Sequence, residues 1–366
     1  MSVVVAAGYS ALVLSREAEI RQRAEAIRSV LRTANPVLDP EFFLATVDKS
    51  RWKPHVVTVS LGKQIVGAVY TKERTVGGIR TGLIYADETF GGIVAAPGQE
   101  REFVLDTGLE CTLRRPGVRG VRLAIPAASF EQDVFRRLAG SAGVELHVAS
   151  SQTRHARLEL PATYDAFLNG LGSTTRRNFR YYRRRSEEAG NVYLEGLALE
   201  ECRRAAYCLA PHCSISSSPQ QLARALDMVA AVPRPLLAGL RNRFGEWLSL
   251  AGGLCHAGSA TLIFQLNCDR DHPKDSLSTV MRSYLIERLI ERGTREVTFW
   301  GGTAGALSRY AGGLAGVQVY LDVRSAGWRA IRMMAALLPR SIPPQIAALA
   351  EWVAPRSNGD ARELLD

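Results

Sequence analysis

The two halves of this chain repeat the same order of secondary-structure signals, and this repeat limits the possible folds more than any other feature. Each half contains two apolar runs on either side of a short polar turn, which predicts a β-hairpin over 55–72 and another over 235–254. The signals of a helix, a short strand, a second helix and a strand follow each hairpin, over 100–149 and over 276–324. Matching segments lie about 175 residues apart, which indicates a tandem repeat rather than two unrelated domains.

The repeat predicts the α/β class, with two tandem units that are each a mixed sheet flanked by helices. We expect an N-terminal unit over 1–155 and a C-terminal unit over 156–326. Residues 327–366 would then form amphipathic helices and a polar tail. Because Trp328 and several apolar residues in 328–353 alternate with arginines, this segment either packs on the body or a second subunit, or contacts an anionic membrane surface.

The charge of the chain favours anionic partners. It has 46 basic and 36 acidic residues, a formal net charge of +10, and only five of the basic residues are lysines. No P-loop, HExxH or dinucleotide-binding motif occurs, so nothing supports a kinase, hydrolase or dehydrogenase. The first residues lack the pattern of a secretory signal and no CxxC pair occurs, which favours the cytoplasm.

The cysteines give no clear metal motif. Cys202, Cys208, His212 and Cys213 lie close together in the sequence, but their spacing matches no common zinc pattern. The first two also fit the buried side of a helix over 199–209. We therefore expect no metal site.

A basic helix is predicted over 173–189, with Ser173 or Thr174 as its N-cap. Ten residues of it contain six arginines, namely Arg176, Arg177, Arg180, Arg183, Arg184 and Arg185. At the helical period Arg176, Arg180, Arg183 and Arg184 share one face. This face is either solvated and partly neutralised by Glu187 and Glu188, or a platform for the phosphates of a cofactor, a nucleic acid or a lipid-linked substrate.

The segment Tyr164–Val192 carries a recognisable motif around this helix. It reads Tyr-x-x-Phe-Leu, then Leu-x-Ser-x-x-Arg-Arg-x-x-Arg, and ends in Arg-Arg-x-Glu-x-x-Gly-x-Val. The motif resembles the acyltransferase domain of GNAT-type proteins, in the group that includes cellulose-biosynthesis-associated acetyltransferases, and is similar to the Fem family of peptidoglycan-bridge aminoacyl transferases. Those families contain two GNAT-like units in tandem. The resemblance extends over roughly 42–323.

The resemblance implies a donor site in the second unit. In a GNAT unit the acyl donor lies between two central strands, with its phosphates at the N-terminus of the following helix. The donor is acetyl-CoA or another acyl-CoA, with aminoacyl-tRNA as the less favoured choice. The residues expected to bind it are Arg270, Lys274, Ser276, Ser278 and Thr279. The alternative is an ordinary polar loop that enters a helix.

Three residues are candidates for proton transfer. His272 in the donor loop and His256 on the second hairpin, beside the donor strands, are candidate bases because the unperturbed histidine pKa is about 6.5. Tyr310 matches a tyrosine of the family, and its phenol would protonate a departing thiolate. His256 is alternatively a core histidine, and Tyr310 a packing residue.

Five residues are expected to bind the acceptor: Arg176, Arg177, Arg180, Trp300 and Arg309. Arginine binds phosphate in a bidentate manner, and tryptophan stacks on sugars or adenine. The acceptor would be an anionic small molecule, a cell-envelope glycan, a lipid-linked sugar or an amine.

The sequence therefore predicts an acyltransferase of the cytoplasm, with peripheral contact at the inner face of the membrane through 328–353. Two alternatives remain. One is a noncatalytic RNA- or phosphate-binding protein that uses the basic helix. The other is a structural partner of a membrane-bound polysaccharide synthase.

Overall fold

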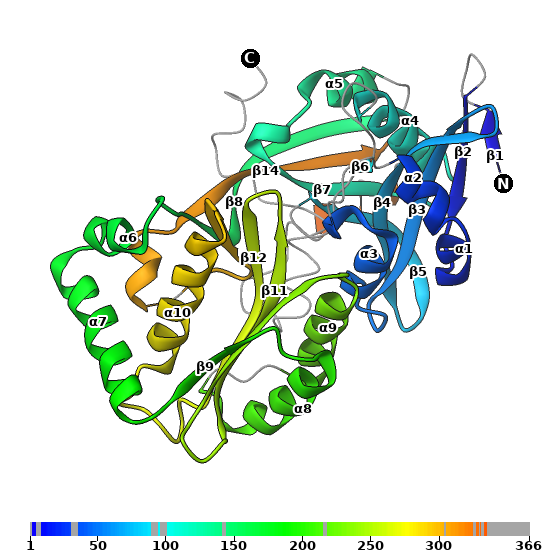
Figure 1. Ribbon diagram of the computed structural model, residues 1–366. Coiled ribbons are helices and arrows are strands. Elements are labelled where there is room, and N and C mark those ends of the chain that lie inside the picture. Colours follow the sequence, from blue (N-terminus) through cyan, green and yellow to red (C-terminus); the bar gives the residue numbers. More distant parts are fainter. Residues whose placement is uncertain are drawn as a thin grey trace. The chain divides into compact units, whose positions relative to one another are not determined.

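The computed structural model of the protein describes residues 2–4, 9–30, 36–88, 94–95, 101–140, 144–214, 218–303, 305–324, 327–328, 330 and 333–334. The chain forms two compact units (Figure 1). Unit 1 contains Met1–Gln152 and Ala315–Asp366, and unit 2 contains Thr153–Leu314.

The sheet of unit 1 begins with a run of antiparallel strands and then changes direction. Its strands, in spatial order, are β1 (Ser2–Val4), β2 (Tyr9–Leu14), β3 (Trp52–Leu61), β4 (Gln64–Val76), β5 (Ile79–Asp87), β7 (Gly120–Pro126) and β14 (Gly312–Val323), while β6 (Val94–Ala95) pairs with β4. β5 and β7 are parallel, and β7 and β14 are antiparallel. The predicted hairpin over 55–72 is the β3–β4 pair.

Helices cover both faces of this sheet. One layer contains α1 (Glu17–Gln22), α2 (Ala24–Val30), η1 (Pro36–Leu38) and α3 (Pro40–Thr46), and the other contains α4 (Arg101–Leu113), η4 (Ala127–Ser129) and α5 (Gln132–Gly140). Val56 packs in the core of the first layer and Val59 in that of the second. β3 is therefore buried on both faces, which explains its nearly continuous apolar sequence.

Unit 2 repeats this design. Its strands, in spatial order, are the C-terminal part of β8 (Val144–Glu159), β13 (Glu296–Phe299), β12 (Ser259–Asn267), β11 (Trp247–His256), β10 (Pro235–Arg241) and β9 (Val192–Glu195). One layer is α8 (Leu199–Leu209), η5 (Ala210–His212) and α9 (Pro219–Ala230), and the other is α6 (Tyr164–Gly170), α7 (Ser173–Glu188) and α10 (Leu277–Glu291) (Figure 1). The predicted second hairpin is the β10–β11 pair, and η6 (Gly305–Arg309) is a 3-10 turn where a helix was expected.

Part of the last strand of each sequence repeat completes the sheet of the other unit. Gly316–Asp322 of β14 pair with Gly120–Pro126 of β7 in unit 1, and Ala156–Glu159 of β8 pair with β13 in unit 2. The predicted boundaries were near residue 155 and at residue 326, and the structure divides the chain after Gln152 and after Leu314, so that most of β14 belongs to unit 1. The α/β class with mixed sheets is confirmed.

A buried ion pair joins β14 to β7. The Arg122 Nη2 donates to Asp322 Oδ1 at 2.6 Å, and the Trp328 indole N–H donates to the same oxygen at 3.0 Å. Trp328 is only 4% exposed, so this residue packs on the body of the protein, which was one of the alternatives expected for its segment. Met333 and Met334 are exposed, and residues 335–353 of the predicted amphipathic segment lie outside the described residues. No helix in the described part of the chain has the length and apolar character needed to cross a membrane.

Candidate active site

The two parallel strands of unit 2, β12 and β13, separate before β12 ends. Their pairing runs from Ser259 opposite Glu296 to Leu262 opposite Phe299, and the Trp300 N–H donates to the Leu262 carbonyl at 2.9 Å. β12 then continues through Asn267, while the other chain turns away at two glycines with positive φ. We call the region between 263–267 and the chain after Phe299 the strand fork. In unit 1, by contrast, β5 remains paired with β7 through its last residue.

Arg282 of α10 extends across the strand fork. Its Nε donates to Gln265 Oε1 on β12 at 3.0 Å, and its Nη1 donates to Thr303 Oγ1, beyond β13, at 2.7 Å. The guanidinium also lies 5.2 Å from the centre of the Phe299 ring. A ligand that enters the fork must therefore contact or displace this side chain.

The strand fork contains a positive charge in a partly buried environment. Burial lowers the pKa of Arg282 to about 10, so the guanidinium remains protonated at neutral pH. Gln265 is itself fixed, because its amide donates to Asn267 Oδ1 at 3.0 Å and to the Ser278 carbonyl at 3.4 Å. The sequence analysis missed Arg282, and its only signal was one cation inside an otherwise apolar stretch of helix.

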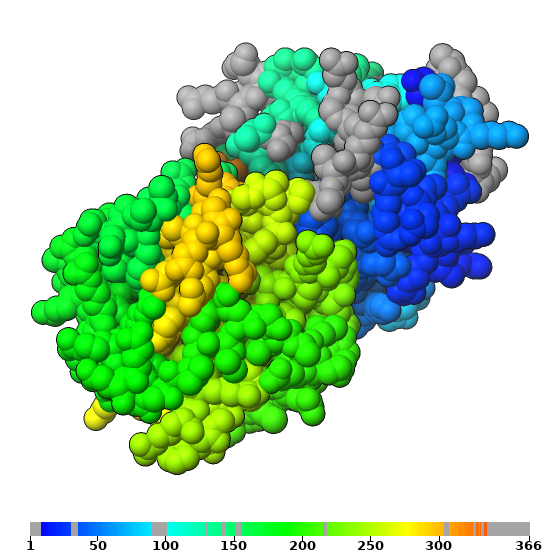
Figure 2. All heavy atoms as spheres, viewed as in Figure 1, coloured from blue at the N-terminus to red at the C-terminus, as the bar shows by residue number. Residues whose placement is uncertain are grey.

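The N-terminus of α10 lies next to the fork and carries four of the five residues expected to bind the donor. Ser276 occupies the N-cap position with φ of 48°, and its hydroxyl donates to Thr279 Oγ1 at 2.9 Å instead of capping a backbone N–H. Lys274 is exposed, and Ser278 is in the first turn of the helix. The fifth residue, Arg270, directs its Nη1 to the Pro211 carbonyl at 3.0 Å. Figure 2 shows α10, in gold, at the surface of the unit.

His272 belongs to an ordered polar chain. Its Nδ1 lies 3.0 Å from Asp275 Oδ2, and Asp275 Oδ1 lies 3.0 Å from the Arg185 Nη2 of α7. A carboxylate on one ring nitrogen leaves Nε2 for proton transfer, as in other histidine bases.

His256 lies at the opposite end of β12 from the strand fork. It pairs with Ser259 at the turn of the β11–β12 hairpin. At about 3.3 Å per residue, the distance along the strand from Ser259 to Gln265 is about 20 Å. The expectation that His256 lies beside the donor strands was therefore wrong about its location.

Tyr310 lies at the N-terminus of the basic helix. Its hydroxyl accepts a hydrogen bond from the Gly172 N–H at 2.6 Å, and this bond, with a second from Thr175, lowers the pKa of the phenol. Asp275 and His272 meet the same helix at Arg185, near its other end. At 1.5 Å per residue these two points of α7 are about 20 Å apart. The structure does not bring Tyr310 and His272 together.

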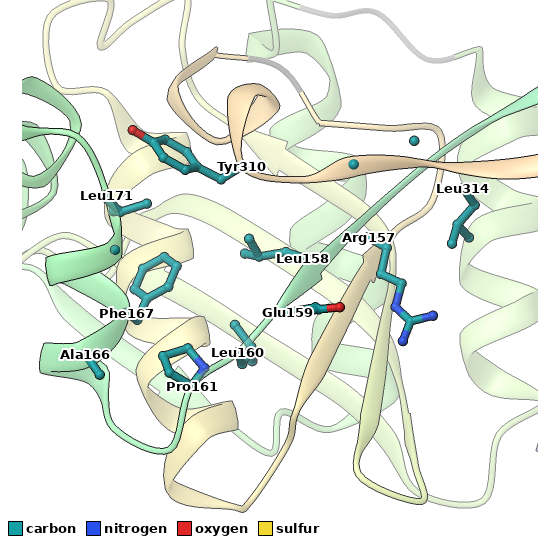
Figure 3. A pocket seen from close by; sticks show the side chains of 13 residues that line it. Arg157, Leu158, Glu159, Leu160, Pro161, Ala166, Phe167, Leu171, Tyr310 and Leu314 are labelled. Carbon is teal, nitrogen blue, oxygen red and sulfur yellow. The ribbon is translucent and has the colours of Figure 1, made fainter.

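Tyr310 also closes one end of an open cleft of about 660 Å³ in unit 2 (Figure 3). Leu158, Leu160 and Phe167 form an apolar floor, and Glu159 and Arg157, which is paired with Glu296, lie toward the other end. The lining residues are Arg157, Leu158, Glu159, Leu160, Pro161, Ala166, Phe167, Gly170, Leu171, Tyr310, Gly312, Gly313 and Leu314. An apolar floor with polar ends suits an amphipathic ligand.

The six arginines of α7 have different environments. Arg183 is paired with Glu187 and Glu287 and stacks on Tyr284, so it faces inward rather than on the predicted face. Arg176 contacts Asn169, Arg184 contacts Glu188, and Arg185 contacts Asp275. Arg177 and Arg180 are exposed and have no partner among the described residues. We call Arg177, Arg180, Arg184 and Tyr181, which share one exposed face at the helical period, the basic face.

The remaining predicted acceptor residues are not on this helix. Arg309 is exposed at the end of η6, and the Trp300 ring makes an edge contact with the ring of His155, with centroids 6.1 Å apart. The His155 Nδ1 accepts a hydrogen bond from the Gly301 N–H at 3.1 Å, and burial lowers the pKa of His155 to about 4. This neutral histidine fixes the turn that opens the strand fork, and the sequence analysis did not single it out.

The fold of this chain is similar to that of FemX, in line with the resemblance found in the sequence. Among solved structures, FemX has a TM-score of 0.55 at 9% identity, over 87% of this chain and 99% of FemX. L-PGS from Bacillus licheniformis has a TM-score of 0.51 at 11% identity, over 85% of this chain and 94% of that one. The C-terminal domain of a proposed lysylphosphatidylglycerol synthetase from Agrobacterium fabrum has a TM-score of 0.51 at 14% identity, over 88% and 96%. No protein-family profile and no curated protein matches the sequence.

Proposed function

We propose that this protein is an acyltransferase whose acyl donor binds in the strand fork of unit 2. The observation that supports this most strongly is the partly buried guanidinium of Arg282, held across the fork by Gln265 and Thr303. A guanidinium fixed by neutral side chains can donate to a carbonyl oxygen and stabilise the negative charge that grows there during acyl transfer. Such preorganised donors usually contribute most to catalysis of this kind.

The surroundings of the fork fit the rest of such a donor. The α10 N-terminus, which the Ser276 side chain does not cap, and the exposed Lys274 suit phosphate groups. His272, oriented by Asp275, meets α7 at Arg185, about 20 Å along the helix from Tyr310, so we do not propose it as the base for an acceptor that binds beside Tyr310. We propose acyl-CoA as the donor and aminoacyl-tRNA as the second choice.

We place the acceptor in the cleft beside Tyr310. Its apolar floor and polar ends fit an acceptor with both apolar and polar parts, such as a lipid-linked sugar, a cell-envelope glycan or an amine. Arg176, Arg309 and Trp300 remain proposed acceptor contacts. Because a lipid-linked acceptor would lie at a membrane, we propose the cytoplasm, at the inner face of the membrane, as the location of the protein.

The test compares acetyl-CoA with CoA, which lacks the thioester carbonyl group, by calorimetric titration of wild-type protein and Arg282→Gln. A hydrogen bond from a charged donor is worth about 1.5–3 kcal/mol, so we expect acetyl-CoA binding to weaken at least about tenfold in the variant. CoA binding should change much less. Arg288→Gln, at an exposed arginine of the same helix, is the matched control.

Two results would contradict the proposal. Equal weakening of acetyl-CoA and CoA would make Arg282 a structural residue. Absence of binding by either ligand would favour aminoacyl-tRNA or the noncatalytic alternative.

One observation favours that second candidate function, which is RNA binding without catalysis. The basic face presents two exposed guanidiniums with no partner in the described part of the chain, Arg177 and Arg180, beside the exposed Tyr181. If they bind phosphates, RNA affinity should fall steeply with salt. The double variant Arg177→Gln and Arg180→Gln should then reduce the slope of log affinity against log salt by about 1.5 to 2.

A further inference from the structure

Three metal-binding side chains meet where the chain leaves β12. His212 ends η5, and Cys268 and Asp271 follow β12 directly. The His212 Nδ1 lies 2.6 Å from Asp271 Oδ2, and the Cys268 thiol donates to the same oxygen at 3.2 Å. One ligand atom from each residue lies within 4.8 Å of the other two.

Backbone hydrogen bonds hold the two segments together. The Arg270 N–H donates to the His212 carbonyl at 3.1 Å, and the Cys268 N–H donates to the Leu248 carbonyl at 2.9 Å. The Arg270 guanidinium adds a bond to the Pro211 carbonyl at 3.0 Å. The positions of the three side chains are therefore set by contacts that do not involve the side chains themselves.

The cluster is accessible to ions from one side. The side chains of His212 and Asp271 are 50% and 53% exposed, whereas Cys268 is 7% exposed. The Cys268 thiol carries the proton that it donates to Asp271. A bound metal ion replaces this proton, because a coordinating thiol is deprotonated.

We propose that His212, Cys268 and Asp271 form a binding site for Zn²⁺. Zinc accepts sulfur, nitrogen and oxygen ligands together, whereas Mg²⁺ and Ca²⁺ require oxygen. Zinc–ligand bonds of about 2.0–2.3 Å place tetrahedral ligand atoms about 3.3–3.8 Å from one another, so the present separations need only small shifts. The fourth position is open to water.

This site differs from the one considered in the sequence. Of the cysteines near His212 in the chain, Cys202 is buried in α8 and Cys208 is exposed, and neither belongs to the cluster. The actual partners come from a distant segment, so their spacing gave no signal. Zinc would join η5 to the segment that enters α10 and so fix the loop that carries Lys274.

The test is calorimetric titration of the full chain with Zn²⁺ after chelator treatment, together with absorption spectra of the Co²⁺ form. We expect one equivalent of zinc to bind, a melting temperature that rises with zinc concentration, and a thiolate-to-cobalt charge-transfer band. Cys268→Ser should abolish that band, and both Cys268→Ser and Asp271→Asn should weaken zinc binding at least tenfold. Cys208→Ser is the matched control and should behave as wild type.

The zinc proposal fails if no zinc binds, if the variants bind it as tightly as wild type, or if the cobalt form lacks the thiolate band. His212→Gln changes a half-exposed residue and so tests the site even if Cys268→Ser fails to fold. None of the three proposed ligands takes part in the proposed acyl transfer. Zinc binding and acetyl-CoA binding can therefore fail independently.

Discussion

The buried ion pair of unit 1 allows a quantitative prediction of how much it stabilises the attachment of β14 to β7. Arg122 and Asp322 are each 1% exposed, and Asp322 Oδ1 accepts from both Arg122 and the Trp328 indole. Asp322→Asn keeps an oxygen acceptor of the same shape but leaves the guanidinium charge buried without its carboxylate. Removing one partner of a buried pair typically costs about 3–5 kcal/mol, and we expect a loss of unfolding free energy in this range.

The double variant Arg122→Met and Asp322→Leu distinguishes the effect of the buried charge on stability from the effect of side-chain packing. With no charge left to bury, it should recover most of the loss, apart from about 1–3 kcal/mol for the Trp328 N–H that loses its acceptor. Urea unfolding, monitored by hydrogen exchange of peptides from β7 and β14, measures the loss of stability in unit 1 itself. A single variant that loses less than about 1 kcal/mol, or a double variant as unstable as the single one, would refute the reasoning.

Two further predictions concern unit 2. The pKa of His155 is about 4 in the folded protein against about 6.5 unfolded, so the unfolded chain binds the extra proton and stability falls by about 3 kcal/mol as the pH drops from 6.5 to 4. Urea midpoints across this range should show a flatter dependence for His155→Gln; an identical dependence would contradict the assignment. Tyr310→Phe removes the acceptor of the Gly172 N–H, so amide exchange at the start of α7 should become faster while acetyl-CoA affinity stays unchanged. A large loss of affinity would instead place the phenol at the donor.

Much of the fold could be predicted because its signals are local. The hairpins, the basic helix and the helix after β12 follow from apolar periodicity and turns within short windows. Lys274, Ser276 and Ser278, in and directly after the loop that enters α10, are likewise neighbours in the chain and therefore neighbours in space.

What the sequence did not reveal depends on contacts between distant segments. Two sheets of the same design present equivalent edges, so the sequence alone does not say which one receives β14. The N-terminus of α7 was expected to be capped by Ser173 or Thr174, but its N-cap is Gly172, whose N–H donates to a phenol 138 residues away. Arg282 and the cluster at His212 were missed for the same reason.

The exchange of end strands has a consequence for synthesis of the chain. Most of unit 1 leaves the ribosome first, but the edge of β7 has no partner until the residues of β14, Gly312–Val323, have been made. During that interval unit 1 presents an open strand edge, which is a template for wrong pairing. The sheet of unit 2 has no such delay, because β8, the strand that pairs with β13, has been made before β13. An expression fragment that stops near residue 155 would keep this edge open permanently, whereas a circular permutant with β14 placed before β1 would supply the partner first.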